Sequence, residues 1–118
     1  MDDPTRIQQV EQSTGHRFRR REWCLRALTH PSLRHESEAV ERDNQRLEFL
    51  GDAVLSLVAA ERLFRQERDL AEGELTRRRE AAVQRAALAR AGRRLGLAEV
   101  LRVSELASLR QQDVHGQE

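Results

Sequence analysis

Two acidic residues four positions apart, Glu48 and Asp52, are the residues of this 118-residue chain best suited to chemistry. On a helix this spacing places both carboxylates on one side, where their like charges repel by roughly a few tenths of a kcal/mol. Gly51 lies between them and costs about 1 kcal/mol of helix propensity. Carboxylate oxygens hold divalent cations such as Mg²⁺, and a glycine leaves room for a group to approach the backbone. The three residues favour a metal site, although an amphipathic helix with solvent-facing acids would show the same pair.

The helix that positions this pair is predicted to run from Asn44 to about Arg65. Its apolar residues recur at helical spacing and form one stripe, which we expect to face the core. Tyrosine is absent and the β-branched residues are scattered, so the chain is predicted to be all-α. The stripe consists of Leu47, Leu50, Val54, Leu57 and Val58.

Residues 46–55, Arg-Leu-Glu-Phe-Leu-Gly-Asp-Ala-Val-Leu, resemble the signature of the ribonuclease III catalytic domain. Residues 28–32, Leu-Thr-His-Pro-Ser, are similar to the Leu-Thr-His-x-Ser turn of the same family. Taken alone, His30 in this turn is better explained as a structural residue than as a metal ligand. The resemblance implies a helical catalytic domain over residues 1–103. It also implies a homodimer that hydrolyses double-stranded RNA, in RNA processing, with Mg²⁺ or Mn²⁺.

The resemblance implies that Glu48 and Asp52 are catalytic residues and metal ligands. Glu72 matches a position whose carboxylate, in the family, lies close to the cleavage centre. An acid at this point would equally begin a helix, because the positive end of the helix dipole favours it. Both interpretations of Glu72 stay open.

Three further residues acquire roles by the same comparison. Phe49 matches an aromatic residue that relatives insert into the partner subunit, and an ordinary core phenylalanine is an equal alternative. Arg77 and Arg78 belong to a run of three arginines. A solvated helix face is the ordinary explanation of such a run, and on this kind of domain a weak RNA contact is the alternative.

The chain also departs from the family pattern. Gln45 stands where the family usually has Glu, and the second acid pair of the family, Asp-x-x-Glu, has no convincing match. Asp113 and Glu118 are five apart, about 140° around a helix, whereas the family spacing gives about 60°. Residues 104–118 are predicted to be frayed or disordered, and the domain to lack its last helices. The chain alone is therefore expected to be a weak or inactive nuclease. The alternative is a non-catalytic module of the same fold that binds RNA or protein.

The remaining elements are also expected to be helical. One helix should run over residues 3–13 with Asp3 as its cap, and another over residues 20–28. Propensity alone predicts one unbroken helix over residues 74–95, whereas the resemblance predicts two that meet near residues 84–85, with Gly96 as the final cap. The second helix is expected to turn four residues towards the core: Trp23, Leu25, Ala27 and Leu28.

Composition limits the other possibilities. Only 38% of the residues are hydrophobic and 35% are charged, and the formal net charge is +1. All 21 cationic residues are Arg. Arginine suits phosphate, but a GC-rich genome explains the same bias, so bulk charge does not predict nucleic-acid binding. No run approaches the roughly eighteen apolar residues of a membrane span, and the acidic start is unlike a signal peptide. A cytoplasmic protein with no membrane partner is expected, in which Cys24 is a small buried residue.

Overall fold

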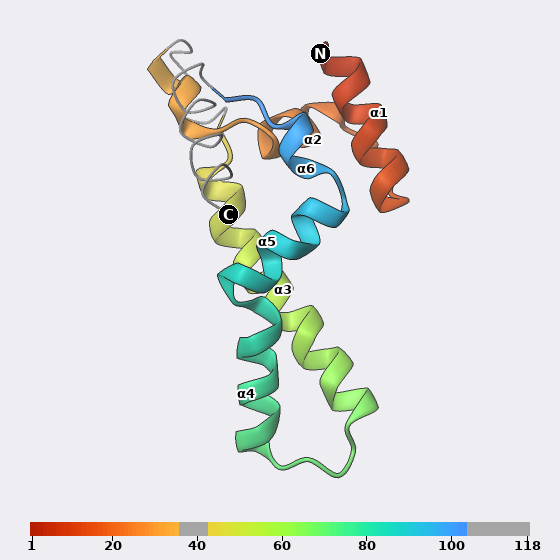
Figure 1. The fold of residues 1–118 in the computed structure, drawn as a ribbon, viewed down its shortest axis with the longest axis vertical. Coiled ribbons are helices and arrows are strands. Elements are labelled where there is room, and N and C mark those ends of the chain that lie inside the picture. The colour runs from red at the N-terminus through yellow and green to blue at the C-terminus, as the bar shows by residue number, and fades with distance from the viewer. Residues whose placement is uncertain (36–42, 104–118) are drawn as a thin grey trace.

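The computed structural model describes residues 1–35 and 43–103 (Figure 1). Within these ranges the chain contains no strand, only an isolated bridge between Thr29 and Arg102. The all-α prediction is therefore confirmed, while the prediction for residues 104–118 lies outside the described residues. None of the described helices is both long and apolar enough to cross a membrane. The elements are α1 Asp3–Thr14, α2 Arg21–Ala27, the 3₁₀ helix η1 Pro31–His35, α3 Gln45–Gln66, α4 Glu72–Val83, α5 Arg85–Arg94 and α6 Leu97–Val100.

The cap of helix α1 is Asp2, one residue earlier than predicted. The carboxylate of Asp2 accepts a hydrogen bond from the Thr5 N–H, at 2.9 Å. The Thr5 side chain and this N–H together lower the pKa of Asp2. Asp3 is instead the first helical residue, and it forms an ion pair with Arg6 at 3.2 Å. Gly15 ends the helix in the left-handed conformation, at φ 72°, which favours glycine.

The buried core is small and lies between α1, α2 and α6. It consists of Ile7, Val10, Cys24, Leu28 and Val100, with Phe18, Leu25, Leu97 and Leu101 packed against it. The prediction that Cys24 is buried is confirmed, and burial raises the pKa of its thiol.

Two residues of α2 do not face the core as predicted. Trp23 is 43% exposed, and the Arg26 guanidinium lies 5.2 Å from the centre of its ring. Ala27 is exposed as well. Cys24 and Leu28 are buried and Leu25 packs against them, as expected for Leu25 and Leu28. Trp23 and Ala27 are four residues apart on a neighbouring side of the helix, which the core does not reach.

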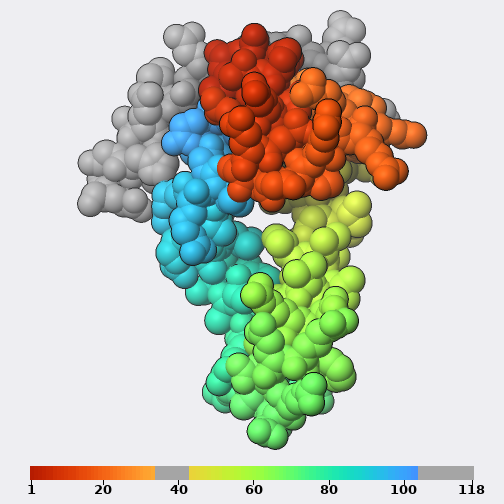
Figure 2. All heavy atoms as spheres, turned by 90° about the vertical axis from the view of Figure 1, so that its right-hand side faces the viewer, coloured from red at the N-terminus to blue at the C-terminus, as the bar shows by residue number. Residues whose placement is uncertain are grey.

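Helices α3 and α4 form an antiparallel hairpin that projects away from this core (Figures 1 and 2). Neither helix contains a fully buried residue. The Cα radius of gyration is 16.5 Å, against about 13 Å for a compact domain of this length. Gln84 is extended, at ψ 157°, and separates α4 from α5. The predicted break is confirmed, as is Gly96 as a left-handed cap at φ 68°.

The apolar stripe of α3 is not buried as predicted. Leu57 is 67% exposed, and Leu50, Val54 and Val58 are each about half exposed or more. Helix α4 covers only one side of α3, and the core residues among those described lie elsewhere. The opposite side of α3 therefore presents an uncovered apolar surface.

Candidate functional site

Three hydrogen bonds join the N-terminal end of α3 to α2 and the residues just after it, and a fourth is local to the helix start. The Asn44 N–H donates to the Thr29 carbonyl at 3.0 Å, and the Asn44 side-chain amide donates to the Ala27 carbonyl at 3.2 Å. The Arg26 Nε–H donates to the backbone carbonyl of Asp43 at 3.3 Å. The buried Asp43 carboxylate accepts from the Gln45 N–H at 3.0 Å. These bonds fix the position of the start of α3. Glu48, the first candidate ligand, follows three residues later.

Glu48 and Asp52 both line one hollow of about 610 Å³ on the side of α3 that faces α5. Neither carboxylate forms an ion pair with any residue in the described part of the chain. A Cβ atom added to Gly51 would meet nothing within 4 Å, so the hollow is open at Gly51, which also lines it. The other residues of the hollow are Gln45, Phe49, Leu55 and Leu88.

The charge of this hollow suits a cation. Two carboxylates and no cationic side chain line it, so an RNA phosphate would be repelled unless a cation lay between. Over residues 1–35 and 43–103 no group of three His, Cys, Asp or Glu side chains could hold a metal ion. A metal held by Glu48 and Asp52 would keep several waters, which Mg²⁺ tolerates. The residues present therefore fit a hydrated divalent cation.

Glu72 is not brought to this hollow by the fold of one chain. It is the first residue of α4, at the far end of the hairpin from the start of α3 (Figure 1). Gln66, the last residue of α3, is 18 positions after Glu48, which corresponds to about 27 Å along the helix. Its predicted place near the cleavage centre therefore requires that it approach from a second copy of the chain.

Arg77 and Arg78 already have carboxylate partners. Both form ion pairs with Glu74, and Arg78 also lies 3.3 Å from a carboxylate oxygen of Glu67. Exposed pairs of this kind contribute less than about 1 kcal/mol. They could be exchanged for phosphate, so the weak RNA contact stays a prediction.

Phe49 is 84% exposed, which excludes the core alternative. It lies at the edge of a second hollow of about 590 Å³, between α2 and the start of α3, with Trp23, Arg26 and Leu50. This arrangement is typical of an aromatic side chain that is available to another surface.

His30 has a structural environment. Its Nδ1 accepts the Ser32 N–H at 3.0 Å, and its backbone N–H donates to the Arg102 carbonyl at 2.8 Å. These bonds join the turn to the segment after α6. The structural interpretation of His30 is therefore confirmed.

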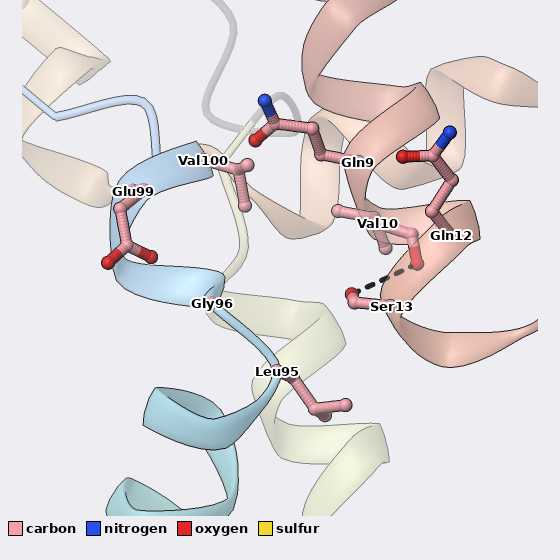
Figure 3. A pocket seen from close by; sticks show the side chains of 8 residues that line it. All are labelled: Gln9, Val10, Gln12, Ser13, Leu95, Gly96, Glu99 and Val100. Carbon is pink, nitrogen blue, oxygen red and sulfur yellow. Dashed lines mark hydrogen bonds between the residues drawn. The ribbon is translucent and has the colours of Figure 1, made fainter.

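Two further hollows contain no residue proposed for the chemistry. One lies between α1 and the α5–α6 turn, where the Ser13 hydroxyl donates to the Val10 carbonyl at 3.3 Å (Figure 3). Glu99 is its only charged residue. The other, of about 540 Å³, is lined by Arg17, Arg19 and Arg21, which the sequence analysis did not single out.

Comparison with known proteins finds similarity over most of the chain. The family model for ribonuclease-III-like proteins matches residues 21–117. Ribonuclease 3 of Phenylobacterium zucineum is 46% identical over 102 residues, which make up 86% of this chain and 42% of that protein. Ribonuclease 3 of Caldanaerobacter subterraneus is 42% identical over 96 residues, 81% of this chain and 42% of that protein. The chain thus spans about 42% of the length of these curated relatives.

A solved structure shares the fold. The nuclease domain of ribonuclease III from Campylobacter jejuni superposes with a TM-score of 0.80 and 35% identity, covering 90% of this chain and 71% of that one. That structure is described as flexible in a region involved in dimer formation.

Proposed function

The chain belongs to the ribonuclease-III-like family, and we propose that it takes part in endonucleolytic cleavage of double-stranded RNA. The observation that carries the proposal is the Glu48–Asp52 pair, because both carboxylates line one open hollow without cationic partners. Retaining two repelling acids beside a helix glycine has a cost in helix stability. A bound cation removes the repulsion and accounts for all three residues.

Glu48 and Asp52 would hold Mg²⁺ or Mn²⁺, and the bound metal would supply charge stabilisation at phosphate and an activated water. The residues of the chain then have distinct tasks. The two carboxylates hold the cation on the side of α3 that faces Leu88. Gly51 keeps the approach to the backbone free. Asn44 and Asp43 fix the helix start, which limits the positions the carboxylates can adopt.

We also propose a homodimer in the cytoplasm, with residues 1–103 as the catalytic unit. Support comes from the exposed side chain of Phe49 and the uncovered apolar side of α3. Uncovered apolar surface of this kind marks an interface. A second copy would also be the route by which Glu72 approaches the cleft.

A non-catalytic RNA- or protein-binding module is the second candidate. Two observations favour it. Gln45 places a neutral amide in the hollow beside Glu48, and no third carboxylate joins the pair within residues 1–35 and 43–103. A metal with two carboxylate ligands is held weakly, which lowers the expected rate of the chain alone.

A cleavage assay on a long duplex RNA separates the two candidates. With high protein concentration and Mg²⁺, slow cutting into short duplexes is expected. The same mixture with a chelator should leave the RNA intact, and a single-stranded RNA of the same sequence should not be cut. Duplex binding without metal-dependent cutting, by a nuclease-free preparation, would instead support the binding module.

The open space at Gly51 gives a separate prediction. Gly51→Ala should stabilise the chain by about 1 kcal/mol, because alanine favours the helix and no atom lies within 4 Å of the new methyl group. Metal-dependent cleavage should fall, since the methyl group enters the hollow that both carboxylates line. Thermal unfolding in chelator and initial cleavage rates measure the two effects.

Gly92→Ala is the matched control, because Gly92 is also a helix glycine with nothing within 4 Å of an added Cβ. It should stabilise the chain without slowing cleavage. If Gly51→Ala behaves in the same way, the open space at Gly51 has no role in the reaction.

A further inference from the structure

The loop between α1 and α2 carries a concentrated positive charge on a fixed backbone. Residues 16–21 read His-Arg-Phe-Arg-Arg-Arg. The Phe18 N–H donates to a carboxylate oxygen of Glu11 at 2.8 Å, and the Phe18 ring packs against the core. The His16 ring meets the Phe18 ring edge-on, with 4.8 Å between centroids. Phe18 therefore anchors the loop.

The arginines on either side of this anchor are exposed. Arg17 and Arg19 form no ion pair with a carboxylate of residues 1–35 or 43–103. Arg21 lies 3.6 Å from Glu11, whose other oxygen already accepts the Phe18 N–H. The negative charge of Glu11 is thus engaged, and the hollow keeps an excess of positive charge.

The shape of this region distinguishes it from the other arginines. Arg17, Arg19 and Arg21 line one hollow of about 540 Å³ alongside α1, which contributes Pro4, Gln8 and Glu11. Arg77 and Arg78 on α4, by contrast, are held by neighbouring glutamates. A guanidinium is a planar fork that matches phosphate oxygens. Unpaired forks around a concave surface are suited to bind phosphate groups.

We propose that Arg17 and Arg19 bind phosphates of the RNA backbone and form a second duplex contact beside the Glu48–Asp52 cleft. The inference rests on the proposed function for its choice of ligand. Helix α2, which follows the loop, has seven residues and is about 10 Å long. Its Trp23 and Arg26 line a hollow together with Phe49 of α3. The loop is therefore one short helix away from α3, within the length of one duplex turn, on the order of 30 Å.

The test is the salt dependence of RNA binding by the double variant Arg17→Gln/Arg19→Gln. Binding of a labelled duplex RNA to the full chain is followed by fluorescence anisotropy, in chelator so that no cleavage occurs. Each lost phosphate contact should reduce the slope of log affinity against log salt by about 1. For the double variant, the slope of log affinity against log salt should therefore be smaller by about 2, and binding should be about tenfold weaker at moderate salt.

Arg93→Gln/Arg94→Gln is the matched control, since both arginines are exposed on α5 and the same charge is removed. It should change affinity by less than about twofold. An equal loss in both double variants would show a bulk charge effect and overturn the site. A competition experiment adds either inorganic phosphate or unlabelled duplex RNA to the complex with labelled RNA. If millimolar phosphate displaces the labelled RNA as well as the unlabelled duplex does, the hollow binds a small anion and the RNA contact is overturned.

The failures of the two proposals can be told apart. If the parent chain cuts duplex RNA and the loop variants bind RNA as tightly as the parent chain, only the proposed loop contact is overturned. If the parent chain binds duplex RNA through the loop but does not cut it, only the proposed nuclease function is overturned. A parent chain that binds no RNA overturns both.

Discussion

Glu48→Gln and Asp52→Asn are each expected to reduce metal-dependent cleavage of duplex RNA at least about 100-fold. A metal ion contributes several kcal/mol of transition-state charge stabilisation, and each 1.36 kcal/mol is a factor of ten in rate. Removing one of the two carboxylates that line the hollow removes half of the charge that holds the ion. Initial rates at saturating Mg²⁺ and direct Mn²⁺ binding measure the two consequences. The affinity for Mn²⁺ should fall at least about tenfold.

The stability of these variants separates a ligand role from a structural one. Both changes are nearly isosteric and relieve the repulsion between the two acids, so the chain in chelator should unfold at the same temperature or slightly higher. Glu61→Gln is the matched control, because Glu61 lies on the same helix and forms an exposed ion pair with Arg65. It should leave metal affinity and cleavage unchanged. Unchanged Mn²⁺ affinity in both Glu48→Gln and Asp52→Asn would remove the basis of the nuclease proposal.

The sequence predicts the helices of this fold well because their signals are local. The cap at Gly15, the cap at Gly96 and the long helix through Glu48 follow from residue type and spacing. The break at Gln84 was predicted only by family resemblance. Helix propensities differ by less than about 1 kcal/mol per residue, so propensity alone does not locate an extended residue such as Gln84.

The sequence does not predict which elements cover the apolar side of each helix. Periodicity identifies the apolar side of α3, but it does not say what covers it, and Leu57 is exposed. The same reasoning predicts Trp23 in the core, although the core contacts of this segment come from Cys24, Leu25 and Leu28. Which helices lie opposite an apolar face is a tertiary property, and no residue of the face encodes it alone.

The candidate site shows the same division. The Glu48–Asp52 pair was found because its spacing is helical, whereas the distance to Glu72 depends on how the hairpin projects. The arginines of the α1–α2 loop were passed over in favour of the run at Arg77. A local signal did exist: no acid lies within four residues of Arg17, whereas Glu74 lies three before Arg77. The absence of a nearby acid is thus the sequence feature that distinguishes Arg17 from Arg77.

Phe49→Asp is expected to convert the proposed dimer into a monomer. The side chain is 84% exposed in the single chain, so its loss should not lower the unfolding temperature of the monomer. A buried aromatic anchor contributes about 2 kcal/mol or more to an interface, which corresponds to a loss of affinity of about 30-fold or more. Sedimentation at several protein concentrations measures the dissociation constant.

Phe64→Asp is the matched control for this change. Phe64 lies on the same helix and is 76% exposed, but it sits near the end of α3 that is far from the hollow beside α2. If Phe49 fills a socket on a second copy, only Phe49→Asp should shift the equilibrium. Because cleavage would then need Glu72 from the second copy, the same variant should also lose activity at concentrations where it is monomeric. A dimer that survives Phe49→Asp, or a parent chain that is monomeric at high concentration, would assign the uncovered side of α3 to some other partner.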